Sequence, residues 1–398
     1  MALMIALTLG SLTPLPTASS LVTASTAFSS AGTITYPSGP TLPSINSPIN
    51  KAVSAYTSGW LTTTQINFIA QHFTLLNTNF GLPSSQMQAL HNANPNLKVL
   101  GYKDLIAMHS DGIDPDWAIV NAHETWFMHD TYGNRIFYSP FNWWLMDPAN
   151  PEWQAYFVND ALAKISASGY DGLFIDDVWN DVTFYCHNLP TTNAQTWHND
   201  VVAFLRYIKA NLPGKIVVVN TDEWYGSTYI NEVDGAMMEG FAHAEWCAAN
   251  DEGGRGSTFN LNLVGKLAAD SANGKIVWAA SGVIPSTQAE DDRLLKYCYA
   301  EFLLGANGAT SYFGFNSWYS SDGAKGYYSI MDTPVGSPTG AYYKSQNVYM
   351  RDFTGAKVLF NPYSTAYTIN LGRTYRTLNG ATVSSITLNA YSAEILLP

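Results

Sequence analysis

The sequence predicts an α/β fold, a (β/α)8 TIM barrel with a small C-terminal antiparallel β-sandwich domain. Two observations lead to this fold class. Eight short apolar runs alternate with helical patterns from Lys51 onward, and the helical patterns stop at Gly355. Alternating strands and helices are typical of a parallel sheet, and eight units in about 265 residues fit a barrel of ~250 residues. A doubly wound open sheet is the alternative, but no G-x-G-x-x-G follows the first run and no P-loop is present.

The eight apolar runs are the predicted barrel strands, and helical patterns lie between several of them. The runs span Ala52–Tyr56, Phe73–Asn77, Lys98–Tyr102, Gly172–Asp176, Lys215–Asn220, Gly235–Glu239, Lys275–Ala280 and Ala309–Phe313. The predicted helices span Thr64–Gln71, Ser84–Asn92, Pro151–Ser168, Thr196–Ala210 and Ala289–Leu304. Ser84 is predicted to be the N-cap of the second helix, because a serine hydroxyl can accept from the first free backbone N–H groups.

Three parts of the chain differ in composition. Residues 1–50 contain no Lys, Arg, Asp, Glu or His and form a charge-free N-terminal arm, linker or signal segment. Its first apolar run resembles a signal peptide without the positively charged start, so a cleaved signal and a retained arm that supports self-association both stay open. Residues 51–345 form the predicted barrel. Residues 346–398 form the predicted β-sandwich domain, with strands at Lys357–Phe360, Thr365–Asn370, Thr382–Leu388 and Ala393–Leu397 and a hairpin turn at Asn379-Gly380.

Composition and charge exclude several classes of partner. The net charge of −12 argues against nucleic acid, which needs a basic surface. No stretch of 18 or more apolar residues is present, so we expect no membrane insertion. The chain has 12 Trp and 24 Tyr but only 13% charged residues, which suits a carbohydrate partner. No H-E-x-x-H or similar spacing is present, and no dinucleotide or phosphate motif, so we expect no metal site and no cofactor.

The best chemical signal is a pattern repeated on the predicted strands four and six. Each of these strands begins Asp-Gly, continues with three apolar residues and ends in a carboxylate, Asp176 or Glu239. Side chains alternate along a strand, and alternate strands contribute to the same inward layer of a barrel. Asp176 and Glu239 are therefore expected near each other at the C-terminal mouth, where barrel enzymes keep their catalytic groups. Two convergent carboxylates are what glycoside hydrolysis requires.

Other candidate residues follow from the predicted strand ends. We expect substrate contacts from some of these side chains: Trp60, Asp104, Asp177, Asn220, Glu223, His243 and Trp278. Asp177 should point out of the lumen, where it orients a neighbour or caps the next helix. Glu223 is the reserve candidate for the acid. Each of these residues also has a structural interpretation, because a Trp is more often a core residue and a lone His more often structural.

Four segments resemble motifs of a known group of TIM barrels. They are Trp126–Arg135, Trp144–Trp153, Gly169–Val178, which is the strongest, and Arg351–Pro362 at the entry to the β-domain. They are similar to hypothetical glycosyl hydrolase family 15. The resemblance extends over roughly residues 60–398 and does not include the arm.

The resemblance implies a glycosidase with acids at the ends of strands four and six, as in α-galactosidase-like barrels. Carried over, Asp176 is the nucleophile and Glu239 the acid/base, although those enzymes have Asp where this chain has Glu239. We therefore predict a retaining glycoside hydrolase that degrades a poly- or oligosaccharide, secreted or on the cell surface. The alternative is a non-catalytic carbohydrate-binding or structural surface or virion protein on the same barrel, which predicts acids too far apart or tied up in salt bridges. A lyase or isomerase is a weaker third interpretation.

Overall fold

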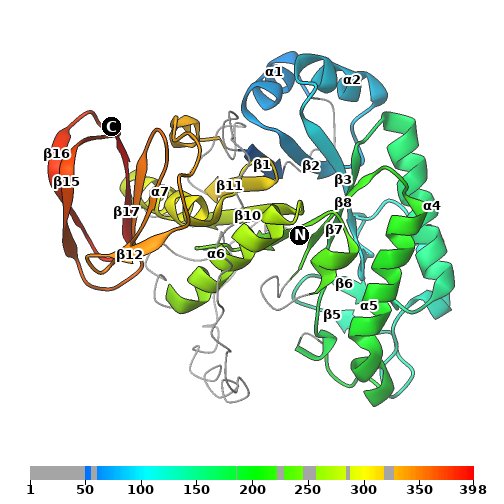
Figure 1. Cartoon of the computed structure of the whole chain (residues 1–398). Coiled ribbons are helices and arrows are strands. Elements are labelled where there is room, and N and C mark those ends of the chain that lie inside the picture. The colour runs from blue at the N-terminus through cyan, green and yellow to red at the C-terminus, as the bar shows by residue number, and fades with distance from the viewer. Residues whose placement is uncertain are drawn as a thin grey trace. The chain divides into compact units, whose positions relative to one another are not determined.

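Eight parallel strands close into a barrel. The computed structural model describes residues 50–54, 61–184, 186–221, 228–244, 257–283, 287–317 and 327–398. Around the ring the strands follow the order β1-β11-β10-β9-β8-β7-β3-β2, so each barrel strand pairs with its neighbours in the chain and β1 closes against β11 (Figure 1). The predicted TIM barrel is thus confirmed.

Each barrel strand overlaps one of the eight predicted runs. The strands are β1 (Asn50–Ser54), β2 (Leu75–Asn79), β3 (Lys98–Asp104), β7 (Gly172–Asp176), β8 (Ile216–Asn220), β9 (Gly235–Glu239), β10 (Ile276–Val283) and β11 (Ser311–Ser317). The predictions for the fourth and sixth strands match the observed bounds, and the others shift by a few residues.

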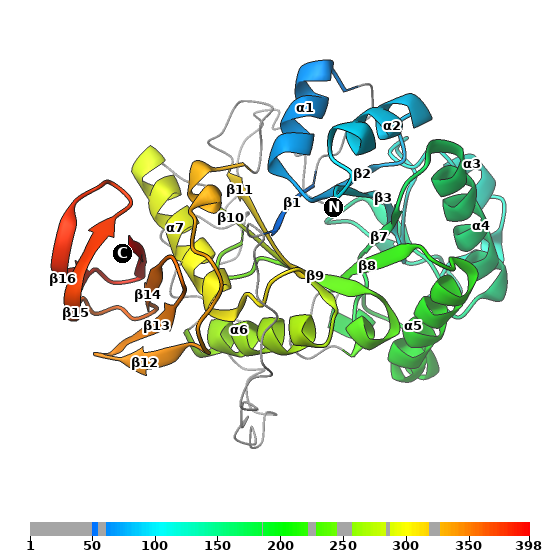
Figure 2. The ribbon, with the colours of Figure 1, turned by 45° about the horizontal axis from the view of Figure 1, so that its top comes forward.

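All five predicted helices are present, and two more are found. The helices are α1 (Thr63–His72), α2 (Ser84–Ala93), α3 (Trp117–Val120), α4 (Pro151–Ser168), α5 (Thr191–Asn211), α6 (Ser257–Ala272) and α7 (Gln288–Gly305). In Figure 2 all of them except the short α3 form the outer layer around the strands. The described residues between β8 and β9 contain a 3₁₀ turn, η5 (Tyr229–Glu232), and no α-helix. None of the helices in the described residues has an apolar stretch long enough to cross a membrane.

The start of α2 corrects one expectation. Ser84 is the first helical residue, and the N-cap is Pro83, which makes no side-chain cap hydrogen bond. The prediction of Ser84 as N-cap is wrong by one position. A complete capping box is found at the start of helix α1 instead. Thr62 accepts from the Gln65 N–H, and the Gln65 side chain accepts from the Thr62 N–H, which satisfies two backbone donors reciprocally.

The barrel lumen is filled by apolar side chains below the mouth. One cluster of buried residues draws a member from every barrel strand: Ala52, Leu75, Leu100, Phe174, Val218, Met237, Trp278 and Tyr312. Within it the Phe174 and Trp278 rings meet edge to face, with centroids 5.7 Å apart. Such layers close the lumen, so polar groups that follow them along the strands lie at the upper rim.

The Asp-Gly starts of β7 and β9 fix the bottom of the barrel wall. Asp171 accepts from the Val99 N–H of β3 at 2.8 Å, and Asp234 accepts from the Val217 N–H of β8 at 2.7 Å. Each aspartate thus ties its own strand to the preceding strand of the ring. In the repeated pattern, the first aspartate therefore stabilises the barrel, and the final carboxylate is the candidate catalytic group.

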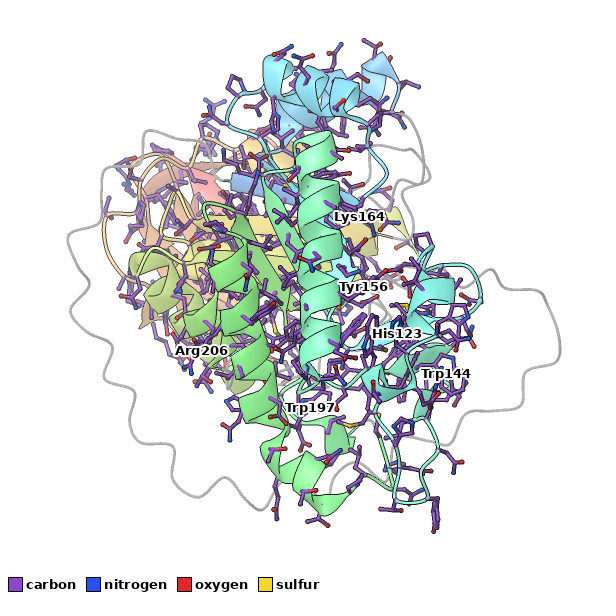
Figure 3. All side chains as sticks on the ribbon, turned by 90° about the vertical axis from the view of Figure 1, so that its right-hand side faces the viewer. His123, Trp144, Tyr156, Lys164, Trp197 and Arg206 are labelled. Atoms are coloured by element: carbon purple, nitrogen blue, oxygen red, sulfur yellow. The ribbon has the colours of Figure 1, made fainter. Side chains whose placement is uncertain are left out.

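A small antiparallel sheet interrupts the barrel between β3 and α4. Its strands are β4 (Ala107–His109), β5 (Phe137–Tyr138) and β6 (Trp143–Leu145), in the order β4-β6-β5. Figure 3 shows His123 and Trp144 in this excursion on one side of α4, which carries Tyr156 and Lys164, while α5 with Trp197 and Arg206 lies on the other side of α4. The Tyr156 hydroxyl donates to Asp116 at 2.9 Å, which anchors the excursion to α4.

The C-terminal domain is an antiparallel β-structure, as predicted. Six strands form one sheet in the order β12-β13-β14-β17-β15-β16. They are β12 (Tyr343–Ser345), β13 (Val348–Asp352), β14 (Lys357–Asn361), β15 (Tyr367–Thr377), β16 (Thr382–Leu388) and β17 (Ser392–Leu397). The sheet encloses its own apolar cluster, which includes Met350, Leu359 and Ile369.

Helix α7 joins the sheet to the barrel. The buried Arg351 guanidinium of β13 donates to the carbonyl oxygens of Leu303, Leu304 and Ala306 at 2.8–2.9 Å. These are acceptors at the helix C-terminus that lack partners within the helix, and a cation there also complements the helix dipole.

Candidate active site

Four neighbouring barrel strands end in polar side chains. The last residues of β3, β7, β8 and β9 are Asp104, Asp176, Asn220 and Glu239. The strands are adjacent in the ring, and Asp104 lies directly beside Asp176 in the register of β3 and β7. All four positions were candidates from the sequence, and the structure brings them together at the C-terminal mouth.

Asn220 links the two acids of the repeated pattern. Its side-chain nitrogen donates to Asp176 Oδ1 at 2.8 Å and to Glu239 Oε2 at 2.9 Å. The two acceptor oxygens are therefore at most 5.7 Å apart, the sum of these distances. If each takes one of the two amide hydrogens, which diverge by about 120°, the oxygens are about 5 Å apart.

Tyr102 links Asp176 to Asp104 on the other side. Its hydroxyl oxygen lies 2.7 Å from Asp176 Oδ2 and 2.8 Å from Asp104 Oδ1. The main-chain N–H of Asp177 also donates to Asp176 Oδ1 at 2.9 Å. Burial opposes the ionisation of Asp176, whereas the hydrogen bonds from Tyr102 and Asn220 lower its pKa. Asp176 is thus a buried carboxyl surrounded by donors, an arrangement that favours the charged form.

Asp177 does not behave as a simple outward-facing residue. Its φ of 54° is left-handed, which ends the alternation of β7, and its carboxyl hydrogen-bonds with Asp104 and Trp179. Burial and the charge of Asp176 raise the pKa of Asp177 to about 6. For Asp104, burial and the charges of Asp177 and Asp176 raise the pKa well above its usual range. Three aspartates therefore meet at one point, and their mutual repulsion and burial favour the neutral form of Asp104 and of Asp177.

The other candidate residues have varied positions. His243 is buried and its Nδ1 lies 2.8 Å from the Gly282 carbonyl oxygen, so that nitrogen carries the hydrogen. Trp278 lies in the lumen cluster below the mouth, where it packs against Phe174. Trp60 and Glu223 lie outside the described residues.

Two tyrosines near the acids were not candidates from the sequence. Tyr102 is two residues before Asp104 on β3, so the period of two places both on the lumen face, and that signal was present in the sequence. Tyr138 comes from the excursion, and its ring lies edge-on to Trp179 with centroids 5.7 Å apart. Burial raises the pKa of Tyr138, and the nearby charge of Asp177 adds to the shift. No local sequence signal connects Tyr138 with β7, because their approach depends on how the excursion folds.

The lysine beside the mouth residues of β3 points away from the lumen. Lys103, between Tyr102 and Asp104 in the chain, faces away from the lumen and pairs with Asp160 at 2.9 Å and Asp116 at 3.6 Å. In the ranges that the structure describes, no group of three or more His, Cys, Asp or Glu side chains is arranged to hold a metal ion. The chemistry that these mouth residues offer is that of carboxyl groups, an amide and a phenol.

Comparisons with known proteins agree with this fold. A noncanonic maltogenic α-amylase, AmyB from Thermotoga neapolitana, is 12% identical with a TM-score of 0.53, over 87% of this chain and 98% of that one. An α-amylase from Malbranchea cinnamomea is 11% identical with a TM-score of 0.51, over 88% and 96% of the two chains. At these identities the likeness concerns the fold alone.

Sequence comparison gives one curated relative and one family. A cycloisomaltooligosaccharide glucanotransferase from Niallia circulans is 28% identical over 110 residues, which is 26% of this chain and only 11% of the relative. The profile of hypothetical glycosyl hydrolase family 15 matches residues 91–357, which include Asp104, Asp176, Asn220 and Glu239. This match confirms the predicted class of enzyme, a glycosidase, at the level of the family. The chain belongs to hypothetical glycosyl hydrolase family 15.

Proposed function

We propose that this protein is a retaining glycosidase that cleaves the O-glycosidic bonds of a poly- or oligosaccharide, with Asp176 as nucleophile and Glu239 as acid/base. The observation that carries the proposal is the amide of Asn220, which contacts both carboxylates. Retaining enzymes have carboxyl groups about 5–5.5 Å apart, and inverting enzymes about 6.5–9.5 Å, to leave room for a water molecule. A separation of at most 5.7 Å supports retention.

The two roles follow from the surroundings of each acid. Asp176 is 2% exposed and accepts hydrogen bonds from Tyr102, Asn220 and a main-chain N–H, so it suits a nucleophile that must be ionised. Glu239 is only half-buried at the end of β9, a position that leaves room for exchange of a proton with a substrate oxygen and with water.

The reaction has two steps. Glu239 gives its proton to the glycosidic oxygen while Asp176 attacks the anomeric carbon, so the glycosidic C–O bond breaks and a covalent glycosyl ester forms on Asp176. Glu239, now ionised, takes a proton from water, whose oxygen attacks the same carbon and releases Asp176. The product keeps the configuration of the substrate because the carbon is inverted twice.

The test is hydrolysis of a panel of polysaccharides and aryl glycosides by the wild-type protein, Asp176→Asn and Glu239→Gln. We expect both variants to lose at least about 100-fold in kcat while their circular dichroism spectra stay unchanged. Asp292→Asn, an exposed acid on α7, is the matched control and should keep full activity.

The configuration of the first product, read by proton NMR, tests retention. An inverted product would mean that Asp176 or Glu239 activates a water molecule as general base. It would rule out Asp176 as a nucleophile. Activity that survives both substitutions would place the site elsewhere, with Glu223 as the next residue to test. Sugar binding without hydrolysis across the panel would favour the non-catalytic alternative.

A further inference from the structure

Tyr102 has one hydroxyl hydrogen and two carboxyl neighbours. Its oxygen lies 2.7 Å from Asp176 Oδ2 and 2.8 Å from Asp104 Oδ1, both within hydrogen-bond range. One hydrogen cannot satisfy two charged acceptors, and two negative carboxylates against one phenol oxygen would be repulsive. The geometry therefore requires that one of the two acids carries a proton.

The surroundings identify which acid it is. Besides the shared Tyr102 hydroxyl, Asp176 accepts hydrogen bonds from the Asn220 side chain and from the main-chain N–H of Asp177, and both favour its charged form. Asp104 is 8% exposed, and the side chains that face it are those of Tyr102, Asp176 and Asp177. Three of the four groups in this cluster are acids, so a proton on Asp104 relieves the repulsion from both sides.

Among the described residues, the remaining charged groups around Asp104 do not reverse this preference. Asp114, beyond β4, adds another negative charge. Lys103, next to it in the chain, is turned to the outer face and pairs with Asp160 and Asp116. Burial and the neighbouring acids together raise the pKa of Asp104 well above its usual range, in agreement with the geometry.

We propose that Asp104 stays protonated in the working enzyme and that Tyr102 therefore gives its only hydroxyl hydrogen to Asp176, so that Tyr102 and Asp104 are positioning residues for the Asp176 carboxylate. A hydrogen bond to a charged acceptor is stronger than one to a neutral carboxyl, which fixes the direction of the Tyr102 hydroxyl. Asp176 is then held at both oxygens, Oδ2 by Tyr102 and Oδ1 by Asn220. The inference rests on the proposed function for its kinetic consequence, but the position of the proton does not depend on it.

Two substitutions separate a proton-bearing Asp104 from a charged one. Asp104→Asn replaces a neutral carboxyl with a neutral amide that still donates to a neighbour, so the acidic limb of kcat/KM should stay at the same pH as in wild type. Tyr102→Phe removes the donor to Asp176, and we expect kcat to fall about 10- to 100-fold with little change in KM. Without that donor the acidic limb of kcat/KM should also move to higher pH, because the charged form of Asp176 loses a hydrogen bond.

Tyr312→Phe is the matched control. Tyr312 lies in the lumen cluster, and in the described structure its hydroxyl has no hydrogen bond to any of these acids. It should leave kcat and the pH profile unchanged, whereas a purely structural role of Tyr102 would change stability without moving the pH profile. An acidic limb that moves to lower pH in folded Asp104→Asn, or an unchanged profile in Tyr102→Phe, would overturn the inference.

A second measurement does not depend on activity. Carbon-13 NMR of labelled aspartate carboxyl groups follows their titration, and the Asp104 signal is the one absent from Asp104→Asn. We expect that signal to titrate well above its usual range, and the Asp176 signal to titrate at higher pH in Tyr102→Phe than in wild type. Titration of Asp104 at its ordinary value near 3.8 would overturn the inference whatever the activity. If the protein is inactive on every substrate but Asp104 and Asp176 titrate as expected, the proposed function is wrong. The proposed position of the proton on Asp104 is then still supported.

Discussion

Asp176 and Glu239 share one hydrogen-bond donor, the side-chain amide of Asn220. The three residues end three consecutive strands of the ring, β7, β8 and β9. The amide holds the two carboxyl groups at a short separation. An asparagine suits this position because its two N–H groups face two acceptors and add no charge.

Replacing this amide with an acid should disturb both carboxyl groups. In Asn220→Asp a third carboxyl would lie 2.8–2.9 Å from its neighbours, and like charges at that distance raise pKa values. We expect kcat/KM at pH 6 to fall by about 100-fold and the acidic limb of the pH profile to move upward. Asn273→Asp, at an exposed position after α6, is the control. A wild-type profile in Asn220→Asp would show that the amide does not control the acids.

The glycines that begin β7 and β9 should not tolerate a side chain. A Cβ at Gly172 would overlap the carbonyl oxygen of Ile216, and one at Gly235 would overlap the carbonyl oxygen of Ile276. Because both contacts are with the main chain of the next strand, neither can move aside cheaply. Gly172→Ala should cost about 3 kcal/mol or more of unfolding free energy, measured by urea denaturation. Gly340→Ala, where a Cβ meets nothing within 4 Å, should be nearly neutral.

Arg351 should decide whether the C-terminal sheet stays docked on α7. Its guanidinium is 3% exposed and donates to three carbonyl oxygens at the end of that helix. Arg351→Met should destabilise the protein by about 2–4 kcal/mol, since several buried acceptors lose their donor. Limited proteolysis should then cut near residues 327–345 sooner than in wild type. Arg373→Ala, at an exposed position on β15, should change stability by less than about 0.5 kcal/mol, and equal losses in both variants would contradict the docking role.

Glu301 on α7 should make the fold less stable as the pH rises. It is fully buried, neither carboxyl oxygen has a hydrogen-bond partner in the described structure, and burial raises its pKa from 4.5 to about 8. Between pH 4.5 and 8 the unfolded chain releases this proton and the folded chain keeps it, so unfolding becomes easier with increasing pH. The full effect is on the order of 5 kcal/mol above pH 8.

Glu301→Met should remove this pH dependence. Urea denaturation at pH 5 and pH 8.5 measures it, and the variant should lose less stability between the two values than wild type does. Asp292→Asn, on the exposed face of the same helix, should behave like wild type. An identical pH dependence in Glu301→Met and wild type would show that Glu301 is ionised in the folded protein.

Several features of the site were predictable from local pattern. The period of two along β7 and β9 places Asp176 and Glu239 on the lumen face, and the Asp-Gly starts set their register. The same period places Tyr102 beside Asp104, although the sequence analysis did not use it. These inferences succeed because alternation along a strand is a local property of the backbone.

Other features follow only from long-range contacts. Helix α6 and the strands β12 and β13 are not among the elements predicted from the sequence, because their local patterns are weak. The left-handed backbone at Asp177 turns a residue expected to face outward toward Asp104. Nothing in the neighbouring sequence requires that turn.

Hydrophobic periodicity and turn residues act over short distances, so the sequence predicts the barrel, the β-domain that follows it and the two strands that end in the candidate acids. The contact of Asn220 with both acids and the position of Tyr102 between two of them depend on how distant strands come together. Closure of the ring sets which strand ends are adjacent, and the stagger between strands sets which side chains meet at the mouth. The proposed protonation of Asp104 also depends on the tertiary structure. Asp104, Asp176 and Asp177 repel one another only when the ends of β3 and β7 bring them together at a buried point.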